Sequence, residues 1–501
     1  MALFASLTLL VILISIFFLY YKKKYSYWSN KGVKGPTPWP VVGNFGNIIL
    51  QKESLDMCIR RIYSKFRAEK LVGIYAGYKP TLLVKDPELV KCVLIKDFDV
   101  FNERGFSSSK SRLSINLFSA DGEKWRIMRQ KLTPVFTTKK LREMIPTIQN
   151  CVKDFLLYVE NLVDKNIDYE IRALAGKYTL EVIGSCAFGL DLHTFTEEEN
   201  EFSKMAKKIF NPSTKLKILN LIDLIFPGIR RNFVSSTERQ EFFVNLVREI
   251  QKEREGKPLK HKDFMDLMIE LKEQGKASRK LEDGIAEIEI DDYMIAAQAL
   301  VFYSAGFETS AATMSFLIHE MALNLDIQDR VYKEICEVVD KHNGDINYDA
   351  IKNMKYLEMV MNETSRKHSI ATVFLRRSTS TYTFPGTNVT IPKGTSIMIP
   401  ASGLHKDPKY FPNPDKFDPE RFAPGKLISS IPQCAFLPFG EGPRICIGMR
   451  FAKVQTLLGT AAFLKKFKVE PSSKTKSELI LDPKAVVVSA KNGIWVKISK
   501  R

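Results

Sequence analysis

Residues 439–448 read FGEGPRICIG, and this stretch is the most informative about the fold and the functional site of the chain. Two glycines and a proline before Cys446 predict a tight loop whose backbone N–H groups can point at the cysteine sulfur. Arg444 adds a permanent positive charge two residues away, and an apolar helix-like run follows over 451–464. The pattern favours a thiolate held as a metal ligand and shielded from water. The alternative is a buried free cysteine in a glycine-rich turn, an interpretation that fits the remaining cysteines.

The composition is that of a globular protein with a strong positive charge. Of 501 residues, 45% are hydrophobic and 26% charged, which excludes collagen-like, mucin-like and wholly disordered chains. The 75 Lys and Arg residues exceed the 57 Asp and Glu residues by 18, so an acidic partner is expected. Seven cysteines without a CxxC or CxxCH motif argue against a disulfide framework, a zinc ribbon and covalent c-type haem attachment.

The N-terminus predicts a membrane anchor. Residues 2–21 carry no charge and span ~30 Å as a helix, about one hydrocarbon thickness. Three lysines, Lys22, Lys23 and Lys24, follow at once, which places the body of the protein in the cytosol. A cleaved signal peptide is the alternative, but it would need a basic n-region and a small-residue cleavage site. We therefore expect a transmembrane anchor over 1–21.

A basic and proline-rich linker is expected over 22–45. The run Gly35-Pro36-Thr37-Pro38-Trp39-Pro40 can form neither a helix nor the centre of a sheet, so it predicts a semi-rigid spacer. An ordinary connecting loop is compatible with the same residues. Tyr25 and Trp28 are suited to a membrane interface.

Beyond residue 45 the chain shows no linker, repeat or low-complexity tract, so 46–501 is expected to form one domain. Apolar residues at three/four spacing predict helices over 146–162, 238–255, 291–324, 326–341 and 351–367. Short β-like runs occur at 82–85, 396–399 and 486–490. The predicted fold is mainly α with a small β part.

The longest predicted helix, 291–324, is apolar nearly all round over 294–307, so we expect that part to be buried on every side. A second membrane span is excluded because Gln298 and Glu308 lie at its middle. Gly306 costs about 1 kcal/mol against alanine inside a helix. It marks either a packing notch between helices or a point where a ligand approaches the backbone.

Two further constellations stand out. Glu363 and Arg366 lie three residues apart and share one helix face, and the run FDPERF over 417–422 offers Arg421 to the same glutamate. Such pairs are usually solvated surface bridges. Upstream, Trp125 and Arg129 lie four residues apart.

Taken together, these motifs resemble the cytochrome P450 family of haem-thiolate monooxygenases, along essentially the whole chain. Residues 439–448 match the haem-binding signature FxxGxRxCxG, 305–310 match the oxygen-activation segment, and the Glu363 network matches ExxR/PERF. Residues 101–105 and 132–136 look like the microsomal xenobiotic-metabolising group, the insect members especially. One departure is that 367–370 contain no proline, so the family pattern does not predict the backbone course before Val373.

The resemblance implies a cofactor, haem b (iron protoporphyrin IX), bound non-covalently with Cys446 as the axial iron ligand. It implies that Thr309 and Glu308 relay protons to bound oxygen, which favours a functional role for the segment around Gly306. Haem-binding positions are implied for Phe439, Gly442, Arg444, Gly448, Trp125, Arg129 and Arg376. A buried structural network is implied for Glu363, Arg366 and Arg421, and a substrate pocket for Phe302, Ala305, Val373 and Phe374.

The resemblance also implies partners. No flavin-binding segment is found, so electrons are expected from a separate NADPH–cytochrome P450 reductase, with cytochrome b5 as a second donor. Five basic residues on or after the helix behind Cys446 would steer that acidic donor: Arg450, Lys453, Lys465, Lys466 and Lys468. The expected location is the endoplasmic reticulum membrane, with the domain on the cytosolic side of the lipid bilayer. Nucleic acid is not expected as a partner, because no binding motif accompanies the charge.

Three functions are compatible with these observations. The first is a monooxygenase that uses O2 and a reduced flavoprotein to oxidise lipophilic foreign compounds such as plant toxins and insecticides. The second is a biosynthetic hydroxylase of an endogenous hormone or lipid. The third is a non-catalytic haem-based gas sensor, which would need neither a proton relay nor a basic docking face.

Overall fold

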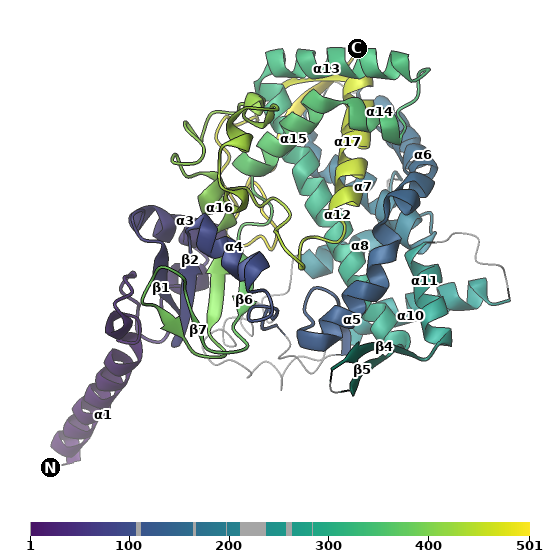
Figure 1. Ribbon diagram of the computed structural model, residues 1–501. Helices are drawn as coiled ribbons and strands as arrows, with labels where there is room; N and C mark the ends of the chain where they lie inside the picture. Colours follow the sequence, from purple (N-terminus) through teal and green to yellow (C-terminus); the bar gives the residue numbers. More distant parts are fainter. Residues whose placement is uncertain are drawn as a thin grey trace.

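The computed structural model describes residues 2–106, 112–163, 167–196, 198–210, 237–256, 263–282 and 284–501. Helices dominate it, as the sequence predicts (Figure 1). They are α1 (Ala2–Tyr25), α2 (Gly46–Ile49), α3 (Leu55–Lys65), α4 (Pro87–Lys91), α5 (Gly122–Leu132), α6 (Thr138–Val163), α7 (Ile171–Ile183), α8 (Glu201–Phe210), α10 (Thr237–Arg254), α11 (Phe264–Glu273), α12 (Asp292–Leu323), α13 (Leu325–Lys341), α14 (Tyr348–Asn353), α15 (Lys355–Lys367), α16 (Ala401–His405) and α17 (Met449–Lys466).

The β part is small and lies mostly to one side of the helices (Figure 1). Its strands are β1 (Leu71–Ala76), β2 (Lys79–Val84), β3 (Tyr169–Glu170), β4 (Lys276–Leu281), β5 (Gly284–Glu289), β6 (Phe374–Arg377), β7 (Tyr382–Thr383), β8 (Thr390–Ile391), β9 (Ser396–Ile399), β10 (Phe467–Pro471) and β11 (Trp495–Lys500). The largest sheet has the order β1-β2-β9-β6, in which only the β2–β9 pair is parallel. This sheet brings β6, from the C-terminal half, beside strands from the N-terminal hundred residues.

Helix α12 is the central element of the helical core and packs on α7, α10, α15 and α17. Its predicted bounds are confirmed, because Asp291 caps its start by accepting a hydrogen bond from Met294 N. The helices predicted over 238–255 and 326–341 are confirmed as α10 and α13, and the strand at 396–399 as β9.

Three predicted elements differ from the structure. Helix α6 begins at Thr138 and contains Pro146 in its interior, rather than starting at the proline. The helix predicted over 351–367 is divided into α14 and α15 at Met354, whose ψ of 71° is not helical. The run 486–490 forms no strand, and the C-terminal sheet is instead built by β10 and β11 with β3.

The N-terminal helix α1 projects from the body of the molecule and ends in Lys22, Lys23 and Lys24 (Figure 1). Among the described residues, no helix combines the length and the apolar character needed to cross a membrane. The transmembrane anchor predicted over 1–21 is therefore not confirmed.

The segment after α1 packs on the domain. Trp28 is buried, and its Nε1 donates a hydrogen bond to Ile74 O of β1 at 3.0 Å. A Cβ on Gly73 would lie 2.3 Å from the Trp28 ring, so the glycine is what admits the indole. The expectation that Trp28 faces a membrane interface is therefore wrong, because β1 offers it an apolar site.

Candidate active site

The loop before Cys446 has the tight geometry that its glycines predict. Gly440 and Gly442 have φ angles of +77° and +73°, which favour glycine. A Cβ on Gly442 would also lie 1.9 Å from Leu94 O, so no larger residue fits there. Cys446 N donates to Phe439 O at 3.0 Å and closes the loop. The cysteine is thus held just before α17, whose N-cap is Gly448.

Cys446 is the one exposed cysteine of the seven. The protein around it nevertheless desolvates the thiol, and this burial raises its pKa. A hydrogen bond from the backbone of Gly448 and the charges of Arg129 and Arg104 act in the opposite direction and stabilise the thiolate. An accessible sulfur with these donors suits a metal ion, which would deprotonate the thiol outright. The prediction that backbone N–H groups point at the sulfur is met by Gly448.

A cluster of arginines surrounds this site. Arg444 donates through Nη2 to Ala120 O at 2.7 Å and lies over the Trp125 ring at 4.2 Å from its centroid. Burial lowers the pKa of Arg444 to about 9, with Arg104 adding to the effect. Burial also lowers the pKa of Arg376 well below its ordinary value, and the nearby Arg104 and Arg444 contribute. These positive charges are therefore poorly compensated.

The unmet hydrogen-bonding capacity of the cluster fits an anionic ligand. Nε of Arg376 and both Nε and Nη1 of Arg444 are buried without a hydrogen-bond partner among the described residues. Asp121 lies 3.6 Å from Arg444 Nη2 and also 3.6 Å from Arg377 Nη2, so one carboxylate is shared between two guanidinium groups. Buried, unpaired arginine nitrogens are costly, and charged carboxylates relieve that cost. The donor set therefore fits the two propionates of haem.

Arg104 is a member of this cluster that sequence reasoning missed. Its backbone N donates to Asp121 Oδ1 at 2.7 Å, and burial lowers the pKa of its side chain to about 10. The charge of Cys446 opposes that shift, which places Arg104 near the thiol. The sequence pointed to Arg104 only as a member of the motif at residues 101–105. Nothing in that local pattern links it to the cysteine loop at residues 439–448.

The middle of α12 is more accessible than the segment before it. Residues 295–299 are all buried, whereas over 300–309 only Tyr303 is, and Ala305 is exposed. The expected burial on every side over 294–307 is therefore wrong. An accessible stretch in the centre of a core helix is a place where a ligand can contact the helix.

Gly306 has a packing reason. A Cβ there would lie 2.6 Å from Ile183 Cδ1 of α7, so the glycine forms a notch between the two helices. Its carbonyl oxygen accepts a hydrogen bond from Gln455 Nε2 of α17 at 3.0 Å. The packing interpretation is thus sufficient for this glycine.

Glu308 and Thr309 are not bonded to each other in the described structure. Thr309 Oγ1 donates to Ala305 O at 2.7 Å, whereas the Glu308 carboxylate pairs with Arg172 of α7. Burial raises the pKa of Glu308, and Arg172 opposes that rise. Adjacent residues on a helix point about 100° apart, which explains the separate partners. A direct relay between the two side chains is therefore absent.

The predicted pocket residues fall in three places. The Phe302 ring lies 4.5 Å from that of Phe264 and 5.6 Å from that of Phe136, measured between centroids. Phe374 begins β6, and its Cε1 would lie 3.2 Å from a Cβ on Gly440, so it contacts the cysteine loop. Val373 instead packs on a separate apolar cluster at the N-terminal sheet.

The Glu363 network is buried, not a surface bridge. The side chains of Glu363 and Arg366 are both 0% exposed. Arg366 donates to the Glu363 carboxylate from Nε at 2.6 Å and from Nη2 at 2.8 Å, and Asp418 N donates to it at 2.9 Å. Arg421 Nε lies 3.4 Å from the same carboxylate. The described structure thus supports the ExxR/PERF arrangement.

Residues 367–370, which lack the proline of the family pattern, are linked by a hydrogen bond to His405. Ser369 Oγ lies 2.7 Å from His405 Nδ1, and Leu437 N donates to His405 Nε2 at 2.8 Å. Burial lowers the pKa of His405 to about 3, so the ring is neutral at pH 7 and Nδ1 carries the proton. Arg366 Nη1 also donates to His405 O at 3.0 Å. These hydrogen bonds join the end of α15 to the residues that lead into the cysteine loop.

The basic residues behind Cys446 are largely paired. Lys453 binds Glu358 at 2.9 Å, Lys466 binds Glu160 at 2.6 Å, and Lys468 binds Glu470 at 2.9 Å. Within the described chain, Arg450 and Lys465 alone of the predicted five have no carboxylate partner. The predicted basic face therefore carries less net charge than the sequence suggests.

Comparisons with known proteins agree with this geometry. The family model described as Cytochrome P450 matches residues 33–497. Cytochrome P450 6B7 of Helicoverpa armigera is 40% identical over 496 residues, covering 98% of this chain and 97% of that protein. Cytochrome P450 6B5 of Papilio glaucus is 41% identical over 473 residues, covering 93% and 98%. Cytochrome P450 6a8 of Drosophila melanogaster is 36% identical over 497 residues, covering 97% of each. With the thiol loop, the arginine cluster and these near full-length relatives in agreement, the chain belongs to the cytochrome P450 family of haem-thiolate monooxygenases.

Proposed function

We propose that this monooxygenase inserts one oxygen atom of O2 into lipophilic small molecules, with foreign compounds as the main substrate class. The observation that carries the proposal is the exposed thiol of Cys446 beside a cluster of buried, unpaired arginine nitrogens. Apolar side chains near this site support a lipophilic substrate. Phe374 contacts the cysteine loop, and Phe302 packs on Phe136, whose ring approaches Gly448. Oxidation of endogenous hormones or lipids is the alternative that product analysis would reveal.

Each site residue has a proposed task. Cys446 would bind the iron of haem b, and Arg129, Arg376, Arg444 and Trp125, joined by Arg104, would seat its propionates. Haem, when bound, supplies the one-electron and O2 chemistry that the side chains lack. Phe439, Gly442 and Gly448 hold the thiolate loop in shape and direct a backbone N–H at the sulfur.

Proton delivery is proposed for Thr309 and Glu308 on α12. The Thr309 hydroxyl donates a hydrogen bond to the Ala305 carbonyl. Because Ala305 is exposed, this part of α12 is accessible to a bound ligand. Glu308 has a raised pKa through burial and can hold a proton more readily than an exposed glutamate. Because Arg172 holds its carboxylate, transfer to Thr309 needs an intervening group such as water.

Electrons are proposed to come from NADPH–cytochrome P450 reductase, with cytochrome b5 as a second donor. Arg450 and Lys465 lack carboxylate partners in the described chain, so they offer the free charge of the α17 surface. Reversing both to Glu should slow reduction at low ionic strength, because steering by unscreened charge is lost. Reversing the paired Lys453 alone should have less effect. Turnover driven by added peroxide, which bypasses the donor, serves as the control.

Membrane attachment at the endoplasmic reticulum is proposed to occur through α1, with residues 46–501 forming the cytosolic catalytic domain. Large apolar side chains of α1 are exposed, including Phe4 at 79% and Leu19 at 66%. Exposed apolar side chains followed by lysines are typical of a segment that contacts lipid. Removal of residues 2–21 should release the enzyme from microsomes while leaving its absorption spectrum unchanged; a spectrum lost together with membrane binding would contradict this.

The thiolate assignment is tested with Cys446→Ala. The reduced, CO-bound spectrum should lose its thiolate signature, whereas Cys336→Ala, at a half-buried position on α13, should keep it. A retained signature in Cys446→Ala would mean that another cysteine binds the iron. Product analysis with reductase-supplemented microsomes, offered plant toxins, insecticides and endogenous lipids, tests the substrate class. Turnover of endogenous lipids alone would overturn it.

A further inference from the structure

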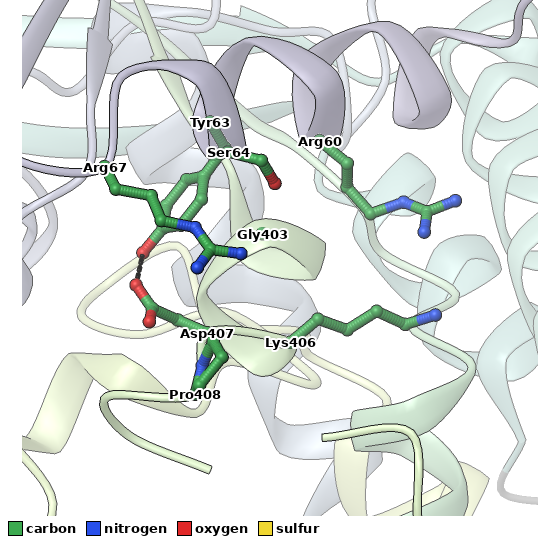
Figure 2. Close-up of a pocket in the computed structure, with 8 residues that line it drawn as sticks. All are labelled: Arg60, Tyr63, Ser64, Arg67, Gly403, Lys406, Asp407 and Pro408. Carbon is green, nitrogen blue, oxygen red and sulfur yellow. Dashed lines mark hydrogen bonds between the residues drawn. The ribbon is translucent and has the colours of Figure 1, made fainter. Parts of the chain in front are cut away.

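A cavity lies away from the haem-thiolate site, between α3 and the end of α16. It encloses about 120 Å³, and none of its lining residues belongs to the site of Cys446. One wall is formed by Arg60, Tyr63 and, just after α3, Arg67. The opposite wall is formed by Gly403 and by Lys406 and Asp407, which follow α16 (Figure 2).

The charge around the cavity is unbalanced. Three cationic side chains line it, Arg60, Arg67 and Lys406, against one carboxylate, Asp407. That carboxylate is already engaged, since it accepts a hydrogen bond from the Tyr63 hydroxyl at 2.6 Å, the dashed contact in Figure 2. Asp56, which pairs with Arg60, is a second carboxylate beside the cavity, so three cations stand against two carboxylates and one positive charge remains in surplus.

The cations have few partners of their own. Arg60 uses Nε to bind Asp56 Oδ2 at 2.9 Å, which leaves its two terminal nitrogens for other contacts. For Arg67 and Lys406, the described part of the chain shows no hydrogen bond or ion pair of the side chain. Figure 2 shows Arg60 and Lys406 extending in the same direction from opposite walls, while Arg67 turns toward Gly403. Donors thus lie on both sides of one hollow.

The surroundings of the cavity disfavour the charged form of Lys406. It is half-buried, and desolvation lowers its pKa to about 8. Arg60 of α3 and Arg366 of α15 lower it further, whereas Asp56 and Asp415 raise it without restoring the ordinary value. An anion beside the ammonium group would remove this penalty.

The backbone keeps the two walls close. A Cβ on Gly403 would lie 2.7 Å from the Tyr63 ring, so only glycine lets α16 approach α3 this closely. Arginine forks and lysine ammonium groups are the usual donors for a tetrahedral oxyanion, and Arg60, Arg67 and Lys406 supply both kinds from the two walls.

We propose that this cavity is a binding site for a phosphate group, carried by a free phosphate compound or by a lipid headgroup. The site is independent of the monooxygenase chemistry, so it stands even if the proposed substrate class is wrong. Its occupant neutralises Lys406 and bridges α3 to the segment after α16.

The test uses the haem-loaded full-length protein and inorganic phosphate, titrated by calorimetry at low and constant ionic strength. Lys406→Gln and Arg67→Gln should each weaken binding about ten- to hundredfold, the loss expected for a hydrogen bond to a charged group. Lys409→Gln, at an exposed lysine of the same loop that does not line the cavity, should change binding less than about fivefold. The exposed Arg67 variant keeps the test valid if Lys406→Gln does not fold.

Two further arms sharpen the result. Sulfate does not titrate near neutrality, so it reports on the protein alone. The affinity of the wild-type protein for sulfate should fall by up to about tenfold per pH unit above pH 8. The affinity of Lys406→Gln should show no such pH dependence. Phosphatidylcholine vesicles with and without phosphatidic acid separate the two sources. A vesicle preference lost in Lys406→Gln identifies a headgroup, and one retained identifies a free phosphate compound. No phosphate binding beyond that of chloride, or equal losses in Lys409→Gln, would overturn the proposal.

Discussion

The Glu363→Gln variant tests whether a fully buried ion pair holds the haem domain together. Gln keeps the size of the side chain but removes its charge, which leaves the Arg366 guanidinium, 0% exposed, without its main counter-charge. The hydrogen bonds that arrive at the carboxylate at 2.6, 2.8 and 2.9 Å cannot all be kept by an amide, which has one acceptor oxygen.

The expected loss is large because the charge stays buried. Breaking one partner of a buried pair costs about 3–5 kcal/mol, a factor of roughly 10² to 10⁴ in the folding equilibrium. That is a sizeable part of the ~5–15 kcal/mol by which a domain is normally stable. The exposed pair Arg142–Asp349 is a matched control, since its two bonds of 2.7 and 2.9 Å are as short but its side chains are about half exposed. Asp349→Asn should cost only ~0–1 kcal/mol.

Urea unfolding of haem-loaded protein, followed by circular dichroism and haem absorbance, measures both effects. Glu363→Gln should unfold at a much lower urea concentration and be purified with less haem, whereas Asp349→Asn should behave like the wild type. The double variant Glu363→Gln/Arg366→Met should recover part of the loss, because it removes the unpaired charge. Equal midpoints for Glu363→Gln and Asp349→Asn would refute the argument that burial makes this pair essential.

Three further predictions concern single side chains. Thr309→Ala should bind haem and substrate but release more of the NADPH electrons as peroxide or water, measured as product per NADPH. Thr313→Ala, one helical turn later, should stay coupled, and loss in both would point to helix damage. Burial raises the pKa of Glu320, but contacts led by His368 outweigh it and bring the pKa to about 2. A lowered pKa stabilises the protein above the unfolded value, so a contribution present at pH 5 is lost as the pH falls toward 2. Glu320→Gln should remove that dependence in acid melts, and a slope identical to wild type would contradict it. Gly442→Ala should purify without haem, because its Cβ would lie 1.9 Å from a backbone oxygen and its φ is +73°; normal haem content would show that the loop can shift.

The sequence alone determined the features that depend on neighbours along the chain. The glycines and proline before Cys446 predict the tight loop, and the apolar periodicity over 291–324 predicts α12. The shared face of Glu363 and Arg366 follows from helical spacing. These predictions hold because turn chemistry and helical periodicity act within a few residues.

Tertiary structure alone decided which distant groups meet. Arg104 joins Arg376 and Arg444 because β6 enters a sheet with N-terminal strands, and no local pattern reports that pairing. Glu308 turns to Arg172 of α7 rather than to its neighbour Thr309. Burial and ion pairing depend on which surfaces the fold brings into contact, and those contacts carry no sequence signal at either partner alone. Ten residues of the sequence therefore contain the proposed iron ligand, while the charges that would hold the cofactor become apparent only in the folded molecule.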